Sequence, residues 1–172
     1  MLRKTSYLFL LFSLGILVSC QEDLVINEVE KTPIITQDWP EKALSKSNIN
    51  LFAERQLQRN QRFEWSMADD FMVYSAAVRT DSVMAIGYQP VGFKNINQRF
   101  HEIDLSSEDW TAVKTKLINF VVEETNKRFP QQKVNAKDLM PFEDDRYLPA
   151  IDIKVYNPDI VAALRAMPEV RY

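Results

Sequence analysis

The final stretch of the chain, residues 147–172, most constrains the fold because its local signals agree with one another. Ile151, Ile153 and Val155 alternate with polar residues, which is the period of a strand with one buried face. The alternation ends in an Asn-Pro pair, and a second short alternation closes the chain. This stretch therefore predicts two strands with a helix between them.

The segment between these strands carries the signals that start and stop a helix. Asn157 can cap a helix, and Pro158 suits the first helical position because its missing N–H would have no partner there. Ile160 and Leu164 place an apolar stripe on one face, and Pro168 ends the helix. Such a connection is most simply a right-handed parallel crossover, which predicts further strands and a covering helix.

Upstream, the same criteria predict a hairpin and a long helix. Residues 71–78 and 82–88 are apolar runs with β-forming side chains, and residues 79–81 are short enough for the turn between them. Ser106 or Ser107 then starts a helix whose mostly apolar stripe runs until a Phe-Pro pair. That helix is long enough to cover a sheet.

Three weaker segments complete the predicted domain. Residues 49–62 predict a helix capped by Ser47 or Asn48, which is either a surface helix lying on the domain or a basic helix that binds a partner. Residues 89–104 are polar and predict a long loop. Residues 139–142 predict a weak edge strand.

The predicted order is hairpin, long helix, edge strand, strand, short helix, strand. This order is typical of an α+β sandwich of the ferredoxin-like type, an antiparallel or mixed sheet with two helices on one face. A chain of 172 residues, 46% hydrophobic and 26% charged, is long enough for one such core. We expect this domain to span residues 48–172.

The start of the chain predicts export and a lipid anchor. Arg3 and Lys4 precede an apolar run, too short for a confident membrane span, that ends in Leu-Val-Ser-Cys, which resembles a bacterial lipobox. We expect residues 1–19 to be a lipoprotein signal peptide and Cys20, the only cysteine, to be acylated. We expect residues 20–47 to form a flexible tether. The protein is expected in the bacterial outer membrane, and the acidic residues after the cysteine resemble a surface-export tag.

Composition and motifs argue against several chemistries. Three scattered glycines cannot form a Walker-type or dinucleotide-binding loop, and a net charge of −3 provides no basic field for nucleic acid. His101, the only histidine, and Ser82 lack the flanking residues of a general base or an exposed nucleophile. One histidine and one acylated cysteine cannot form a zinc site. We expect neither a cofactor nor catalytic residues in this chain.

Two short segments are candidates for binding a partner. Glu143, Asp144 and Asp145 could bind calcium or cap helices of a partner domain, although a solvated turn is the simpler interpretation. Arg171 and Tyr172, at the end of the last predicted strand, are the other candidates.

Several stretches also resemble a known family. Residues 150–155, 160–165 and 167–172 form a strand, a helix ending in Ala-Leu-Arg, and a Pro-x-Val turn before a last strand. This pattern resembles the second half of the propeptide, or inhibitor, domain of subtilisin-like serine peptidases. Residues 63–66 and 85–88 resemble, more loosely, the region ahead of the catalytic domain in surface lipoprotein subtilases.

The resemblance implies an N-terminal pro-region that assists folding of a subtilisin-like catalytic domain and temporarily inhibits it. In such families the sheet packs on helices of the peptidase, and the tail after the last strand lies in the substrate cleft. This tail would follow Tyr172, so we expect the domain to be truncated at its C-terminal end. The chain would then be part of a longer precursor, and the partner would be the catalytic domain of the same precursor. The alternative is a stand-alone envelope lipoprotein that binds a partner through its open sheet edge.

Overall fold

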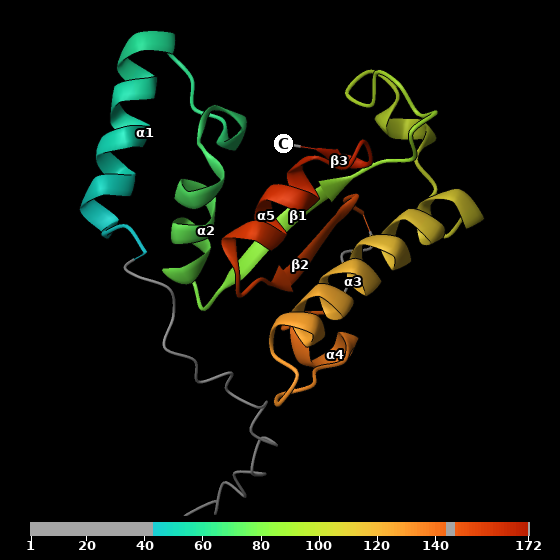
Figure 1. The fold of residues 1–172 in the computed structure, drawn as a ribbon. Helices are drawn as coiled ribbons and strands as arrows, with labels where there is room; N and C mark the ends of the chain where they lie inside the picture. The colour runs from blue at the N-terminus through green and yellow to red at the C-terminus, as the bar shows by residue number, and fades with distance from the viewer. Residues whose placement is uncertain (1–42, 144–146, 172) are drawn as a thin grey trace, which may run out of the picture. The chain divides into compact units, whose positions relative to one another are not determined.

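The computed structural model of the protein describes residues 43–143 and 147–171 (Figure 1). They form a mixed α/β domain with a small antiparallel sheet and several helices, which confirms the predicted combination of helices and sheet. The helices are α1 (Lys46–Asn60), α2 (Asp70–Val78), α3 (Glu108–Arg128), α4 (Ala136–Leu139) and α5 (Pro158–Arg165). The strands are β1 (Val83–Tyr88), β2 (Ala150–Lys154) and β3 (Val170–Arg171).

The sheet has β1 at its centre, with β2 and β3 as antiparallel neighbours (Figure 1). Met84 lies opposite Ile153, and Ile86 lies opposite Ile151. In contrast, β3 pairs only with Gly87 and Tyr88 at the end of β1. Because β2 and β3 both run antiparallel to β1, they are parallel to each other, as the predicted crossover requires, with β1 inserted between them.

The β2-α5-β3 unit forms as its sequence predicts. The Asn157 side chain accepts a hydrogen bond from the Asp159 backbone N–H at 2.7 Å, and Pro158 occupies the first turn of α5. Ile160 and Leu164 are completely buried. Local capping and the apolar stripe therefore agree with the tertiary structure in this unit.

The predicted strand over residues 71–78 is wrong, because this segment is helix α2. Asp69 caps the helix by accepting a hydrogen bond from the Met72 backbone N–H at 2.7 Å. Val73 and Tyr74 are both buried although they are neighbours in sequence. A run that is apolar on all sides carries no period, so the sequence pattern cannot distinguish a buried helix from a buried strand.

The predicted hairpin is consequently absent, although its second strand is confirmed as β1. Asp81 and Ser82 lie between α2 and β1 with φ of 55° and 63°, in the left-handed region. The Ser82 backbone N–H donates to the Ala77 carbonyl at 2.9 Å. This turn reverses the chain at the end of a helix, where the sequence suggested a reversal between two strands.

The long helix is confirmed as α3, with Ser107 as its N-cap residue. The Ser107 side chain does not cap the helix; its hydroxyl donates to the Asp104 carbonyl at 2.8 Å. Trp110, Leu117 and Val121 are buried along one stripe, as predicted.

The predicted edge strand over residues 139–142 is also wrong, because Leu139 ends the short helix α4 and residues 140–142 are irregular. The Asn135 backbone N–H donates to Asp138 Oδ2 at 2.8 Å, and the Asn135 side chain accepts in return from the Asp138 N–H. This capping box stabilises one helical turn, which buries Leu139 completely. Among the described residues, β2 is therefore the edge of the sheet on this side.

Helix α1 confirms the helix predicted over residues 49–62, but its cap differs. Ser45 accepts the hydrogen bond from the Asn48 backbone N–H, so the predicted caps Ser47 and Asn48 are wrong. The helix ends before Gln61, which has a φ of 56°. No residue of α1 is buried, and it contacts α2, as a surface helix would.

One apolar interior joins the parts of the domain. Ile153 and Leu164 from the C-terminal unit belong to the same buried cluster as Tyr74 from α2 and Leu117 from α3. Trp110 adds an edge-to-face contact with the Tyr88 ring, at 5.9 Å between centroids. The prediction that the C-terminal unit shares its core with the long helix is confirmed.

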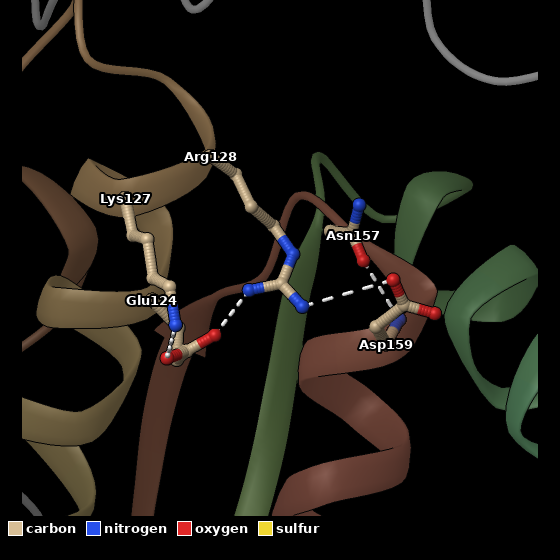
Figure 2. A network of polar contacts seen from close by, with 5 residues as sticks. All are labelled: Glu124, Lys127, Arg128, Asn157 and Asp159. Atoms are coloured by element: carbon tan, nitrogen blue, oxygen red, sulfur yellow. Dashed lines mark hydrogen bonds and ion pairs between the residues drawn. The ribbon is translucent and has the colours of Figure 1, made fainter.

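A network of hydrogen bonds and ion pairs connects the end of α3 with the start of α5 (Figure 2). Arg128 donates to Glu124 and lies 3.7 Å from Asp159 Oδ2, beside the cap made by Asn157. Lys127 adds a second cation 3.6 Å from Glu124. The hydrogen bond from Arg128 lowers the pKa of the Glu124 carboxyl. These contacts connect the end of α3 with the start of α5.

Candidate partner-binding surface

The two faces of the sheet have different surroundings. Ile86, Ile151 and Ile153 are buried in one apolar cluster with Leu117 of α3 and Leu164 of α5. Side chains alternate across a strand, so their neighbours point to the opposite side, where Ala85 and Asp152 are exposed. We call this side the open face. The residues of β1 and β2 on it are Val83, Ala85, Gly87, Ala150, Asp152 and Lys154.

Small side chains form the middle of the open face. Ala85 lies opposite Asp152, and Gly87 lies opposite Ala150. A solvated face of an antiparallel sheet is usually polar, whereas methyl groups and a glycine allow the backbone of a partner to approach closely. Sequence reasoning did not single out these residues. The signal in the sequence that could have identified this face was the pair of small residues Ala85 and Gly87, two positions apart in β1.

The predicted candidate Glu143 lies at the β2 margin of the open face. It is exposed, and it lines a hollow of about 330 Å³ together with Phe142 and Leu148. Ala85 and Asp152 form the other side of this hollow. The structure thus places a carboxylate beside the small residues of the sheet.

The predicted candidate Arg171 lies at the other margin. It is opposite Gly87, which places its side chain on the open face. One guanidinium nitrogen, Nη2, donates to Asn97 Oδ1 at 3.3 Å. Burial lowers the pKa of the Arg171 guanidinium. Glu143 and Arg171 therefore give the open face one negative and one positive margin.

The other predicted site residues are not placed by the structure. Cys20, Asp144, Asp145 and Tyr172 lie outside the described residues, as does the predicted signal peptide.

Apolar side chains are exposed along the Glu143 margin. The exposed fractions are 61% for Phe142, 83% for Tyr147 and 50% for Leu148. Scattered exposed apolar residues are common on soluble proteins, but Phe142 and Leu148 both line the hollow beside the open face, which favours a surface that contacts another molecule.

His101 and Ser82, the two side chains considered above for catalysis, lie on different segments of the domain. His101 is exposed, and its Nε2 lies 3.8 Å from Glu102. Ser82 lies in the turn before β1, and no hydrogen bond to its hydroxyl is found in the described part of the chain. Within residues 43–143 and 147–171, no three His, Cys, Asp or Glu side chains gather as a metal site requires.

An ion pair between a buried glutamate and an exposed lysine precedes β3. Lys116 Nζ on α3 donates to Glu169 Oε1 at 2.5 Å, and Glu169 is only 7% exposed. This hydrogen bond lowers the pKa of the Glu169 carboxyl. The Glu169 carbonyl accepts from the Gln89 N–H at 2.8 Å. Glu169 therefore connects α3, the end of β1 and β3.

No family model, curated protein or solved structure matches this chain. Among the residues that the structure describes, none of the helices combines the length and the apolar character needed to span a membrane.

Proposed function

We propose that the chain is the N-terminal pro-region of a secreted, lipid-anchored subtilisin-like serine peptidase, acting as its intramolecular chaperone and temporary inhibitor. The open face carries this proposal, because it combines small central residues with an exposed apolar margin and charges of opposite sign, Glu143 and Arg171, at its two margins. Such a surface suits docking of a folded domain better than contact with water.

We further propose that the domain is a variant of the ferredoxin-like sandwich. In its favour, β2, α5 and β3 form a β-α-β unit with β1 inserted between its strands, and α3 follows β1 as the first helix of that fold would. The remaining strand of the fold would lie beside β2, where the described residues form α4 and an irregular segment.

The chaperone role follows from folding kinetics. A catalytic domain with many non-local strand pairings loses chain entropy on closing long loops before those pairings stabilise it. Such a domain therefore folds slowly. A preformed sheet surface lowers this barrier by holding two helices of the peptidase side by side. The Glu143 carboxylate would favour the N-terminus of one such helix, because that end is positive.

The coding sequence provides the first test. If it continues beyond the codon for Tyr172, we expect Asp-Thr-Gly, His-Gly-Thr and Gly-Thr-Ser segments, in that order. A stop codon directly after Tyr172 would remove the role in cis. The stand-alone envelope lipoprotein would then be the better description.

Binding of the whole chain to the encoded peptidase domain tests the open face. We expect Asp152→Arg to weaken this binding about tenfold, because it puts a long cation on the docking surface. Glu123→Arg, an exposed position on α3, is the matched control and should change binding little. Equal binding by wild type and Asp152→Arg would rule out docking through this face.

The anchor proposed at Cys20 has a separate test. We expect Cys20→Ser to lose metabolic palmitate label and to shift the protein from the membrane fraction to the soluble fraction. Label retained by Cys20→Ser would rule out acylation at this residue. Because this result does not depend on the peptidase, it tests localisation alone.

A further inference from the structure

Helix α1 lies on the surface of the domain and buries little of itself. Its fifteen residues are all partly or fully exposed, and it packs on α2. Phe52 is half-buried, packs against the core and makes an edge-to-face contact with Phe63, at 6.2 Å between ring centroids. An isolated helix of this length is only marginally stable in water. The helical state of α1 therefore depends on the contacts that hold it to the domain.

The backbone just before α1 is held by two side chains from α2 and its C-cap. Arg79 Nε donates to the Leu44 carbonyl at 3.0 Å, and Arg79 Nη2 donates to the carbonyls of Ala43 and Leu44 at 3.0 and 2.9 Å. The Leu44 N–H donates to the Ser75 hydroxyl oxygen at 3.0 Å, and Ser75 is completely buried. Hydrogen bonds from a charged donor are stronger than those between neutral groups. We therefore expect Arg79 to contribute most of the polar attachment of this segment.

The other end of α1 has the features of a hinge. Gln61 follows the helix with a φ of 56°, in the left-handed region. Arg62 and Glu64 are exposed and lie 3.6 Å apart, in an ion pair that solvent weakens. Hinges in proteins are a few residues at the end of an element that absorb a change in backbone angles. Rotation at residues 61 and 62 would move α1 as a unit and break its ring contact with Phe63.

We propose that residues 43–60 form a hinged arm that undocks from α2 as one unit while the rest of the domain stays folded. Undocking breaks the hydrogen bonds that Arg79 and Ser75 make with the arm, and it exposes little apolar surface because α1 buries little of itself. Segments with few buried contacts open at a lower free energy than the whole domain. The strength of the Arg79 contacts therefore sets how often the arm undocks.

Undocking changes the reach of the chain that precedes the arm. The fifteen residues of α1 span about 22 Å as a helix, and up to this length is added to the connection between the preceding segment and the domain. With the lipid anchor proposed at Cys20, an undocked arm would let the sheet stand farther from the membrane. This consequence rests on that anchor, whereas the undocking itself does not.

Native-state hydrogen exchange of the whole chain tests the undocking. We expect the amides of Phe52 and Gln56 to share one free energy of opening, which is lower than that of Leu117 in α3. Arg79→Met should speed exchange in α1 about tenfold, because the undocked state has already lost the hydrogen bonds that this substitution removes. Trypsin cleavage after Arg55, an exposed residue of α1, should increase by the same factor.

Lys116→Met is the matched control, because it breaks the ion pair with Glu169, which undocking of the arm leaves intact. We expect this variant to speed exchange at Leu117 about tenfold and to leave exchange in α1 unchanged. If α1 opened only when the whole domain unfolds, Lys116→Met would speed exchange equally in both helices, and that result would overturn the proposal. Unchanged exchange in α1 for Arg79→Met would also overturn it.

Circular dichroism shows whether each variant folds. If Arg79→Met does not fold, Ser75→Ala takes its place, because it removes the acceptor of the Leu44 N–H and changes the side-chain volume little. Ser75→Ala should likewise speed exchange in α1. A negative result would leave the proposed pro-region function untouched, since exchange is measured without the peptidase domain.

Discussion

Helices α2 and α5 pack against each other, but they are buried to different degrees. Helix α5 buries Ile160 and Leu164, while Ala163 on its other side is exposed. Helix α2 also contacts α1, and its buried residues include the neighbours Val73 and Tyr74 (Figure 1). A helix with one solvated side keeps a visible period of 3.6 residues, whereas a helix covered on several sides loses it.

The largest expected effect on stability comes from a substitution in α5, the amphipathic helix. Leu164→Asp buries an unpaired carboxylate in the common core, at a cost of several kcal/mol, comparable with the whole stability of a domain this size. We expect the cooperative thermal transition followed by circular dichroism to be lost. Ala163→Asp, on the exposed side of the same helix, should unfold close to wild type. An unchanged thermal midpoint for Leu164→Asp would mean that α5 is not part of the core.

The Lys116–Glu169 pair should have the next largest effect. Lys116→Met leaves the Glu169 carboxylate without its partner and should cost about 1 to 2 kcal/mol, reduced because Lys116 is 55% exposed. Chemical denaturation at neutral pH measures this loss.

The same pair predicts a pH dependence. The pKa of Glu169 is lower in the folded protein than in the unfolded chain, where it is about 4.3. Its contribution is therefore present above the unfolded pKa and is lost as the pH falls through the folded pKa. Glu169→Gln should remove this part of the acid dependence; identical acid profiles for wild type and Glu169→Gln would contradict the assignment.

Substitutions at the helix caps allow α2 and α5 to be compared directly. Asp69→Ala and Asn157→Ala each remove one side-chain cap, and each should cost about 1 kcal/mol. Equal losses in urea denaturation would mean that both helices depend on capping to a similar extent. A negligible loss for Asp69→Ala alone would mean that burial by its neighbours, not its cap, maintains α2.

The smallest effect is expected for the network between α3 and α5 (Figure 2). Arg128→Met keeps the apolar part of the side chain but removes the contacts with Glu124 and Asp159, and it should cost less than about 1 kcal/mol. High salt should reduce the difference from wild type. A loss as large as that of Lys116→Met would mean that Arg128 also has a packing role.

The candidate surface was predictable only in part. Glu143 and Arg171 stand out in the sequence because they are charged and lie beside predicted elements. Ala85 and Ala150 do not, because a small residue in a strand signals nothing until pairing brings it beside another. Cross-strand neighbours far apart in sequence are specified by register, which no local pattern contains.

The sequence by itself determined the C-terminal strand, helix and strand, the length of α3, and the position of β1. In these segments capping residues and apolar periodicity point to one structure. Only the tertiary structure decided that residues 70–78 form a helix, that residues 136–139 form another, and that one sheet face stays open. For residues 70–78 the physical reason is burial: an apolar run that packs on several sides shows no period, so its neighbours decide its conformation. Residues 136–139 form a single turn, which is too short to show a period.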